Sequence, residues 1–397
     1  MGHLTPGRRC LTAAGLVLGM VATAGCQGRP AAGDGPYARD VADAIPSIER
    51  GTGLRFKRPP VLQTRSRDQL RDFLEQRFKD QTTTAQVAGE QTFFRALGLI
   101  PDTLDLQKFL VELLTEQVVG FYDPHTKVLY VVDGAPPDKV GFVISHELVH
   151  ALQDQYVNLD SIQNVRGEND RTLAAQAVIE GQATLVPLLA VLGPTANLPG
   201  GWDRVREQIR DSHASDMQVF RSAPTLLQET LIFPYLSGAE FMHEFEQRLP
   251  GQQPYGANMP SSTEQILHPG EFFGPRRIEP LSITLPAPST GHVTYVDDMG
   301  EFQTRLFLFQ FLQDQNVAMR GAGGWAGDKY EVVHFPSGDG VAWLTLWKSS
   351  VQAAEFGSDA EQIIAHRFAQ TAPRETKNGK VYTLQGRTIT RSEERRV

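Results

Sequence analysis

The sequence predicts an α+β fold with one large unit and a smaller one after it. Two runs rich in β-branched residues, 118–122 and 128–132, are joined by Asp-Pro-His-Thr and predict a β-hairpin. Apolar residues recur at spacings of three and four over 67–79 and 104–116, which predicts two amphipathic helices before the hairpin. The chain has 397 residues, 41% of them hydrophobic, so it can bury a sizeable core and exceeds the usual length of one domain.

A further helix is expected immediately after the hairpin. Residues 135–138, Ala-Pro-Pro-Asp, interrupt the second strand and offer Asp138 as a helix N-cap. The apolar residues that follow recur every four positions and predict a face turned toward the core; they are Val140, Ile144, Leu148 and Leu152. At about 100° per residue, His146 and His150 fall on roughly the opposite face. Both imidazoles are therefore expected to point the same way, one turn apart.

The stretch SHELVHALQDQ, residues 145–155, carries these two histidines. Zinc hydrolysis requires three protein ligands, an open position for water and a base beside that water. Histidines at i and i+4 can bind one ion from one helix face, and a glutamate between them can act at the same site. Roughly 0.015 such matches are expected by chance in a chain with 10 histidines. We therefore predict that His146 and His150 bind Zn²⁺ and that Glu147 is the general base.

Glu180 is the expected third ligand. It is the only charged residue between positions 172 and 197, and a lone carboxylate in so apolar a helix is costly to bury unless a cation meets it. The small neighbours Gly181 and Ala183 would let this helix approach another element closely. Three other acids follow the motif: Asp154, Glu168 and Asp170. Solvent exposure would explain the acids of the loop, and Asp154 could instead hydrogen-bond a ligand histidine.

These motifs carry a resemblance to a known family. HELVH followed by IEGQAT resembles the glutamate-zincin (gluzincin) metallopeptidases, and HELVHALQDQ, AVIEGQAT, FPYLSGAEF and STEQILHP are similar to exported bacterial proteins related to the peptidase MA-like zincins. The match spans residues 118–269. It implies a zincin-like fold, peptide-bond hydrolysis, a zinc ion held by His146, His150 and Glu180, and Glu147 as base.

The sequence departs from the gluzincin pattern in three ways. Glu180 follows His150 by 30 residues, which is longer than in thermolysin-like enzymes. Thr184 stands where those enzymes place an acid behind a ligand, and no Gly-x-Met-Glu-Asn signature of exopeptidases occurs. The resemblance therefore implies neither a substrate specificity nor an exopeptidase or endopeptidase mode.

A peptidase also needs a donor to the oxyanion and a surface that holds the substrate. The candidate donors are Tyr235, His268 and Tyr255, although a tyrosine in LIFPYLSG is more often a core aromatic and a histidine in ILHP is more often a structural loop residue. The strand 128–132 is a candidate edge for an extended peptide, and an ordinary paired strand is the alternative.

The N-terminus reads as an export signal. Arg8 and Arg9 precede an apolar run from 11 to 24, which is shorter than the roughly 20 residues of a membrane-spanning helix. Residues 1–25 are therefore expected to be a signal peptide. Thr-Ala-Gly-Cys resembles a lipobox, with Thr23 in place of the usual Leu, so Cys26 is expected to be lipidated and 26–36 to form a flexible tether. Simple secretion is the alternative.

Cysteine content and charge narrow the partners. The two cysteines are Cys10, inside the signal, and Cys26, so a mature chain has no thiol for a disulfide or a metal and any ligands must be His, Asp or Glu. The formal charge is −8, and removing the two arginines of the signal makes it −10. Such an acidic chain argues against nucleic-acid binding, and we expect the membrane link to be the lipid alone.

We expect a zincin-like domain over 37–285 and a small α+β domain over 286–397, the latter supporting the enzyme or contacting substrate. We also expect helices at 202–213, 238–248, 300–313 and 351–370, strands at 330–335 and 341–347, and a hairpin at 381–389. The overall prediction is a zinc metallopeptidase anchored as a lipoprotein to the outer face of a bacterial membrane. A zinc-binding lipoprotein without catalysis and a scaffold for envelope proteins are the alternatives.

Overall fold

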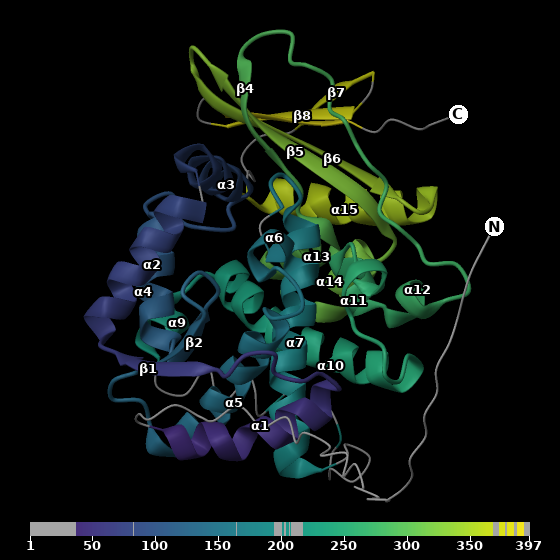
Figure 1. Ribbon diagram of the computed structural model, residues 1–397. Helices are drawn as coiled ribbons and strands as arrows, with labels where there is room; N and C mark the ends of the chain where they lie inside the picture. The colour runs from purple at the N-terminus through teal and green to yellow at the C-terminus, as the bar shows by residue number, and fades with distance from the viewer. Residues whose placement is uncertain are drawn as a thin grey trace, which may run out of the picture.

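The computed structural model shows a mixed α+β chain with helices in several layers and three small sheets among its described residues (Figure 1). It describes residues 37–81, 83–163, 165–193, 217–367, 373–377, 379–384 and 387–392, together with residues 201, 204, 205 and 207. The α+β class predicted from the sequence is confirmed. The expected signal peptide, Cys26 and the tether lie outside the described residues, as does most of the helix expected at 202–213.

The first sheet contains the predicted hairpin. Strand β2 (Gly120–Asp123) pairs antiparallel with β3 (Val128–Val132), and β3 also pairs in parallel with β1 (Val61–Arg65), so the strand order is β1-β3-β2. Because β3 is paired on both sides, it offers no free edge. The expectation that a peptide could lie along 128–132 is therefore wrong, and the edge strands of this sheet are β1 and β2. The pairing with β1, made across more than sixty residues, is not visible in local sequence patterns.

The motif lies on α5 (Pro137–Gln153), which packs against β2, β3, α1 (Ala38–Thr52) and α7 (Asn169–Leu192). Its predicted core face is confirmed, since all four members are buried: Val140, Ile144, Leu148 and Leu152. Its predicted start is wrong by two residues. Pro136 is the N-cap and Asp138 lies in the first turn, because a proline at the first helical position already has the backbone angle that a helix needs.

Helices α7 and α10 (Thr225–Arg248) pass unusually close to one another. A Cβ atom added to Gly181 would lie 2.2 Å from the carbonyl carbon of Gly238, and one added to Gly238 would lie 2.0 Å from the carbonyl oxygen of Ala177. The close approach predicted for Gly181 is confirmed. α7 is long and apolar enough to cross a membrane by length and composition, but 61% of its most apolar window is buried inside the protein. It is the central helix of the fold (Figure 1).

The remaining elements before position 285 are mostly short helices around these. The predicted helices 67–79 and 104–116 are confirmed as α2 and α4, and the helix expected at 238–248 is the second half of α10. The elements around α5, α7 and α10 are α2 (Arg67–Gln81), α3 (Thr84–Leu97), α4 (Leu106–Gln117), α6 (Leu159–Gln163), α9 (Gln218–Ser222), η2 (Gly256–Asn258), α11 (Thr263–Leu267) and α12 (Pro269–Phe273).

The C-terminal part contains two sheets, drawn at the top of Figure 1, of orders β4-β5-β6 and β7-β8-β9. The predicted helices, strands and hairpin of this part are confirmed, whereas β4 and β7 were not expected. The elements are β4 (His292–Asp297), α13 (Gly300–Leu312), α14 (Gln315–Ala322), β5 (Trp325–Phe335), β6 (Gly338–Trp347), α15 (Ser350–Arg367), β7 (Arg374–Thr376), β8 (Gly379–Leu384) and β9 (Arg387–Ser392).

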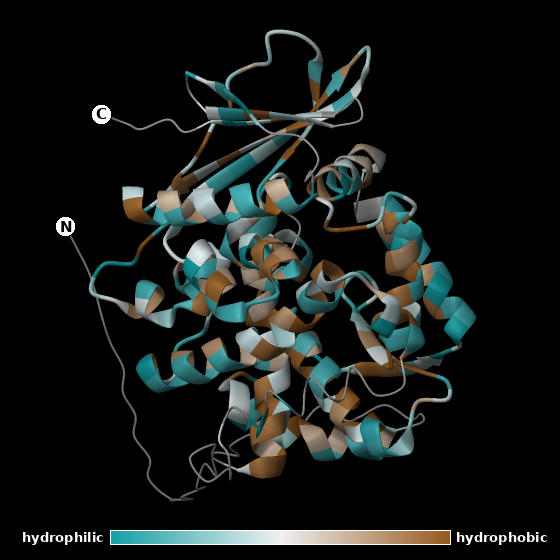
Figure 2. Cartoon of the chain, turned by 180° about the vertical axis from the view of Figure 1, so that it is seen from behind, coloured by the Kyte–Doolittle hydropathy of each residue, from teal (hydrophilic) through white to brown (hydrophobic). Residues whose placement is uncertain are grey.

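Among the described residues, the two largest of three hydrophobic clusters hold most of the molecule together. One joins α1 and the first sheet to α5, and the other joins α3, α7 and α10 to α13, β5 and α15. The second cluster contains residues from both sides of position 285; for example, the rings of Phe233 and Phe302 stack with centroids 4.0 Å apart. Figure 2 shows the hydrophobic residues gathered on the central helices, with more hydrophilic residues on the outer ones.

Candidate metal centre

The structure brings His146, His150 and Glu180 into one small triangle. The Nε2 atoms of the two histidines are 3.1 Å apart, and Oε2 of Glu180 lies 3.1 Å from Nε2 of His146 and 3.3 Å from Nε2 of His150. The histidines come from successive turns of α5 and the glutamate from α7, which crosses beside it. Within the described ranges this is the one group of three or more His, Cys, Asp or Glu side chains whose ligand atoms lie close enough together to bind one metal ion.

The triangle matches what zinc requires. Zinc–nitrogen and zinc–oxygen bonds of about 2.0–2.1 Å in a tetrahedral site place neighbouring ligand atoms about 3.3–3.4 Å apart. The observed separations of 3.1–3.3 Å are close to that value. Three protein ligands also leave a tetrahedral position for water or substrate, as in catalytic rather than structural zinc sites. The donor set and its spacing therefore fit Zn²⁺ without rearrangement.

The electrostatics of the group call for a cation. Burial alone would raise the pKa of Glu180, but the neighbouring His150 charge and hydrogen bonds from both histidines hold it well below its ordinary value. Burial lowers the pKa of His150, whereas the Glu180 carboxylate raises it, and the net result is about 9. The carboxylate thus keeps its negative charge and attracts either protons or a metal ion to the two rings.

Gln153 supports His150 from behind. Its side-chain oxygen lies 2.9 Å from Nδ1 of His150, and its amide nitrogen donates to the carbonyl oxygen of Ile179 at 3.0 Å. Sequence reasoning missed this residue, although a glutamine three positions after His150, and so one helical turn from it, was a visible signal. The alternative role of Asp154, a hydrogen bond to a candidate ligand histidine, is wrong. Asp154 accepts from Tyr122 and Lys127 instead.

Glu147 is buried beside the edge strand β2. It is only 8% exposed, and a Cβ atom on Gly120 would lie 3.7 Å from its Cγ. Burial raises the pKa of Glu147, while the charges of His146 and His150 and a hydrogen bond from the backbone of Tyr122 oppose this effect. A carboxylate with a raised pKa next to a metal site is suited to take a proton from water near neutral pH.

Tyr235, on α10, lies beside His146 and Glu180. Its ring stacks on His146 with centroids 5.9 Å apart. The negative charge of Glu180, followed by burial, the charge of Glu147 and a hydrogen bond to Glu180, raises the pKa of its hydroxyl well above the ordinary value. The hydroxyl therefore stays protonated and can donate a hydrogen bond.

The other two candidate donors lie elsewhere. His268 stands between α11 and α12, and its Nε2 lies 2.7 Å from Oε1 of Glu301. Helix α11 contacts the Asp170 end of α7, about 15 Å along that helix from Glu180 at 1.5 Å per residue. Tyr255 donates its hydroxyl hydrogen to Gln182 at 2.6 Å, behind His150.

The remaining acids considered as ligands are also engaged elsewhere. Oε2 of Glu168 forms a 3.0 Å ion pair with Arg171. Asp170 accepts hydrogen bonds from the backbone and hydroxyl of Thr263. Neither belongs to the metal-binding group, which leaves Glu180 as the carboxylate that faces the histidines.

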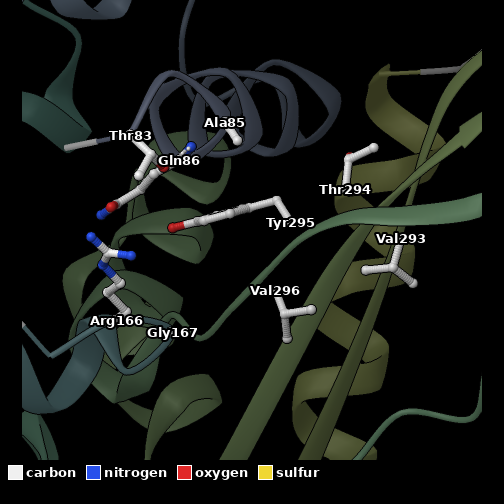
Figure 3. A pocket seen from close by; sticks show the side chains of 9 residues that line it. All are labelled: Thr83, Ala85, Gln86, Arg166, Gly167, Val293, Thr294, Tyr295 and Val296. Carbon is white, nitrogen blue, oxygen red and sulfur yellow. Dashed lines mark hydrogen bonds between the residues drawn. The ribbon is translucent and has the colours of Figure 1, made fainter.

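A surface cavity of about 410 Å³ lies away from this group. It is lined by residues of α3, of the loop before α7 and of β4, and Figure 3 shows Arg166 and Gln86 approaching each other at one end with the Tyr295 ring across it. None of the metal-binding or catalytic candidates lines it. The candidate site is thus defined by the chemistry of α5 and α7 and not by this cavity.

Comparisons with known proteins concern other parts of the molecule or are distant. Residues 291–396 match the model of a family described as "Domain of unknown function (DUF8575)". Among curated proteins none matches the chain. A protein of Chloroflexus aurantiacus, whose structure is described as "Crystal structure of a putative hydrolase with a novel fold", is similar with 22% identity and a TM-score of 0.35, over 60% of this chain and 87% of that one. The candidate metal centre lies outside the matched family range and rests on its own geometry.

Proposed function

We propose that this protein is a zinc-dependent metallopeptidase of the gluzincin type, in which His146, His150 and Glu180 hold the metal. The observation that carries the proposal is the triangle of ligand atoms, 3.1–3.3 Å on each side, with Glu147 next to it on the same helix. Zinc at such a site supplies Lewis-acid polarisation of a carbonyl and brings the pKa of bound water to about 7.

Glu147 acts as the general base. Its carboxylate takes a proton from the attacking water and later delivers it to the leaving amine, for which a raised pKa is favourable because the group must release the proton again. Tyr235 supplies the hydrogen bond to the oxygen of the scissile carbonyl as negative charge develops there. Its protonated hydroxyl, directed at the Glu180 side of the group, suits that role.

The edge strand β2 holds the peptide. The N–H of Val132 donates to the carbonyl oxygen of Val119, so these two residues form a hydrogen-bonded pair. In an antiparallel sheet such pairs alternate with pairs that are not hydrogen-bonded, so the backbone groups of Gly120 and Tyr122 point away from β3. The Tyr122 N–H bonds Glu147. The N–H and carbonyl of Gly120 and the carbonyl of Tyr122 are then suitable hydrogen-bond partners for an extended peptide that lies beside Glu147.

The first test is metal content and hydrolysis with the purified full chain. We expect one zinc per chain, lost or much weakened in His146→Ala and Glu180→Ala, and unchanged in the control Glu168→Gln. Cleavage of a mixed peptide library, read by mass spectrometry, should disappear in Glu147→Gln while its zinc remains. A folded wild type that takes up no zinc would overturn the proposal, and zinc binding with no cleavage of any peptide would favour a scaffold.

We further propose that the protein is exported and tethered to the outer face of a bacterial membrane through a lipid on Cys26, and that it acts on extracytoplasmic peptides or proteins. The motif around Thr23–Cys26 supports this placement. Cys26→Ser should release the protein from the membrane fraction without changing its zinc content. Equal membrane retention of that variant would contradict the lipid anchor.

A further inference from the structure

The polar residues behind His150 form a continuous buried chain that the chemistry above does not use. Gln153 on α5, Gln182 on α7 and Tyr255 in the loop before η2 are linked in series to the ring of His150. We propose that this chain positions His150 for metal binding: it fixes the ring in the form with hydrogen on Nδ1, and it sets the spacing between the two helices that carry the ligands. The inference rests on the proposed metal centre.

The direction of each hydrogen bond follows from the partners. The Gln153 amide nitrogen has two acceptors, the carbonyl oxygen of Ile179 and the side-chain oxygen of Gln182, both at 3.0 Å. Nitrogen only donates in an amide, so the Gln153 oxygen must be the atom that faces His150. That oxygen accepts at 2.9 Å, which requires hydrogen on Nδ1, so Nε2, 3.3 Å from Oε2 of Glu180, is the nitrogen that a metal ion would take.

Gln182 is held in turn from the other side. Its side-chain oxygen accepts from Gln153 and, at 2.6 Å, from the hydroxyl of Tyr255. With two donors on the same oxygen, the Gln182 amide cannot turn over without losing both bonds. The chain therefore has one consistent arrangement, in which each link from Tyr255 through to His150 pairs one donor with one acceptor.

The same chain joins the two ligand helices at the level of the site. Gln153 follows the ligand His150 by three residues, and its bond to Ile179 reaches the backbone immediately before the ligand Glu180. A change in the distance between α5 and α7 would thus break this bond as it moved Glu180 away from the histidines. The glutamine couples ring orientation to helix spacing.

Simple packing does not account for these residues. Gln153 is 0% and Gln182 is 3% exposed. A buried amide costs free energy unless all its groups are satisfied, so an apolar side chain would fill the space at lower risk. Outer-shell partners that orient a ligand histidine typically change metal affinity by about 10–100-fold when removed.

The test compares zinc affinity across substitutions matched in shape. Gln153→Met keeps the volume and removes the oxygen, and we expect about 10–100-fold weaker zinc binding in a chelator competition. Gln153→Glu keeps an acceptor for Nδ1 of His150 but loses both amide donors, so it should bind zinc more tightly than Gln153→Met and less tightly than wild type. Tyr255→Phe removes only the end of the chain and should weaken binding by a smaller factor. The control is Thr184→Val, since the hydroxyl of Thr184 has no hydrogen-bond partner within the described part of the chain; it should leave zinc affinity unchanged.

A second readout separates positioning from stability. Nitrogen-15 NMR of the histidines in the zinc-free protein, recorded above about pH 9 so that the His150 ring is neutral, should show His150 with hydrogen on Nδ1 in wild type and a mixture of both forms in Gln153→Met. Folded Gln153→Met with wild-type zinc affinity or an unchanged tautomer would overturn the inference and leave the metal centre intact. If Gln153→Met does not fold, Tyr255→Phe with wild-type affinity and tautomer would do the same. A wild type that binds no zinc would overturn the metal centre and this inference together.

Discussion

At the scale of single residues, the site depends on side chains that are costly to bury alone and compatible together. Glu180 keeps its charge inside a helix bundle because two imidazoles face it, and Glu147 sits close by with a raised pKa. The buried Tyr235 remains protonated because the same carboxylates surround it. These three environments follow from one arrangement, in which α5 and α7 cross with α10 beside them.

Tyr235→Phe should therefore impair turnover and not metal binding. Removing a hydrogen-bond donor to a developing oxyanion typically lowers kcat by about 10²–10³-fold, with KM little changed. Steady-state kinetics on a peptide found in the library screen, together with zinc content, would measure this. Tyr156→Phe is the control, because the Tyr156 hydroxyl donates to the backbone of Arg55. A kcat in Tyr235→Phe equal to that of the control would exclude Tyr235 as the donor.

At the scale of elements, the position of Glu180 is determined by how closely α7 can approach α10. Gly181 directly follows Glu180, and its Cα faces the backbone of Gly238. The absence of side chains at both positions lets the two backbones touch. A larger residue at either position would separate the helices and shift Glu180 relative to α5.

Gly181→Ala should destabilise the protein by about 2 kcal/mol or more, because its Cβ would lie 2.2 Å from a backbone carbon that cannot move independently. Zinc affinity should fall as well. Gly141→Ala on α5 is the matched control: no atom lies within 4 Å of its added Cβ, so it should stabilise by about 0.5–1 kcal/mol. Denaturant unfolding measures both. Equal stability of the two variants would contradict the close packing.

At the scale of the whole molecule, the C-terminal part is joined to α7 by buried acids as well as by the shared core. Asp297 and Asp298 accept the backbone N–H groups of Asn169 and Asp170 at the start of α7. Tyr295 links Asp297 to Glu90 of α3 through hydrogen bonds to both carboxyls. The helix that carries Glu180 therefore begins on side chains from the far end of the chain.

This junction makes stability depend on pH. Burial, with a smaller effect from Asp297, raises the pKa of Glu90 from 4.5 to about 7, and burial raises that of Asp297 from 3.8 to about 6. The folded state holds these protons more tightly than the unfolded chain. Their contribution is therefore fully present below about pH 4 and is lost as the pH rises through 6 to 7.

Glu90→Gln should remove part of that dependence. We expect the variant to be more stable than wild type at pH 8, by up to about 3 kcal/mol, and similar to it near pH 4.5. Free energies of unfolding measured for both proteins across this range test the prediction. A difference that does not change with pH would mean that Glu90 titrates normally.

Metal removal should also be felt by the whole molecule. A ligand that binds only the folded state stabilises it by about 2.7 kcal/mol at one hundred times its dissociation constant. Chelation should thus lower the thermal midpoint of wild type and leave that of His146→Ala unchanged. Equal shifts in both proteins would point to a chelator effect unrelated to the site.

Local sequence patterns predicted much of the fold because the physics behind them is local. The period of four in α5, the turn between β2 and β3 and the lone charge of α7 each depend on neighbours within a few positions. They were sufficient for the class, for most helices and for the grouping of His146, His150 and Glu180. The start of α5 was misassigned because two prolines and an aspartate compete for the same cap.

The sequence by itself determined which side chains can bind a metal and that His146 and His150 share a helix face, because spacing on a helix follows from its pitch. Only the tertiary structure decided that β3 is an interior strand, that Gln153 rather than Asp154 supports His150, and that Tyr235 reaches the group while His268 does not. Each of these depends on contacts between segments far apart in the chain. Such contacts arise when several elements bury their apolar faces together, and no single segment encodes them.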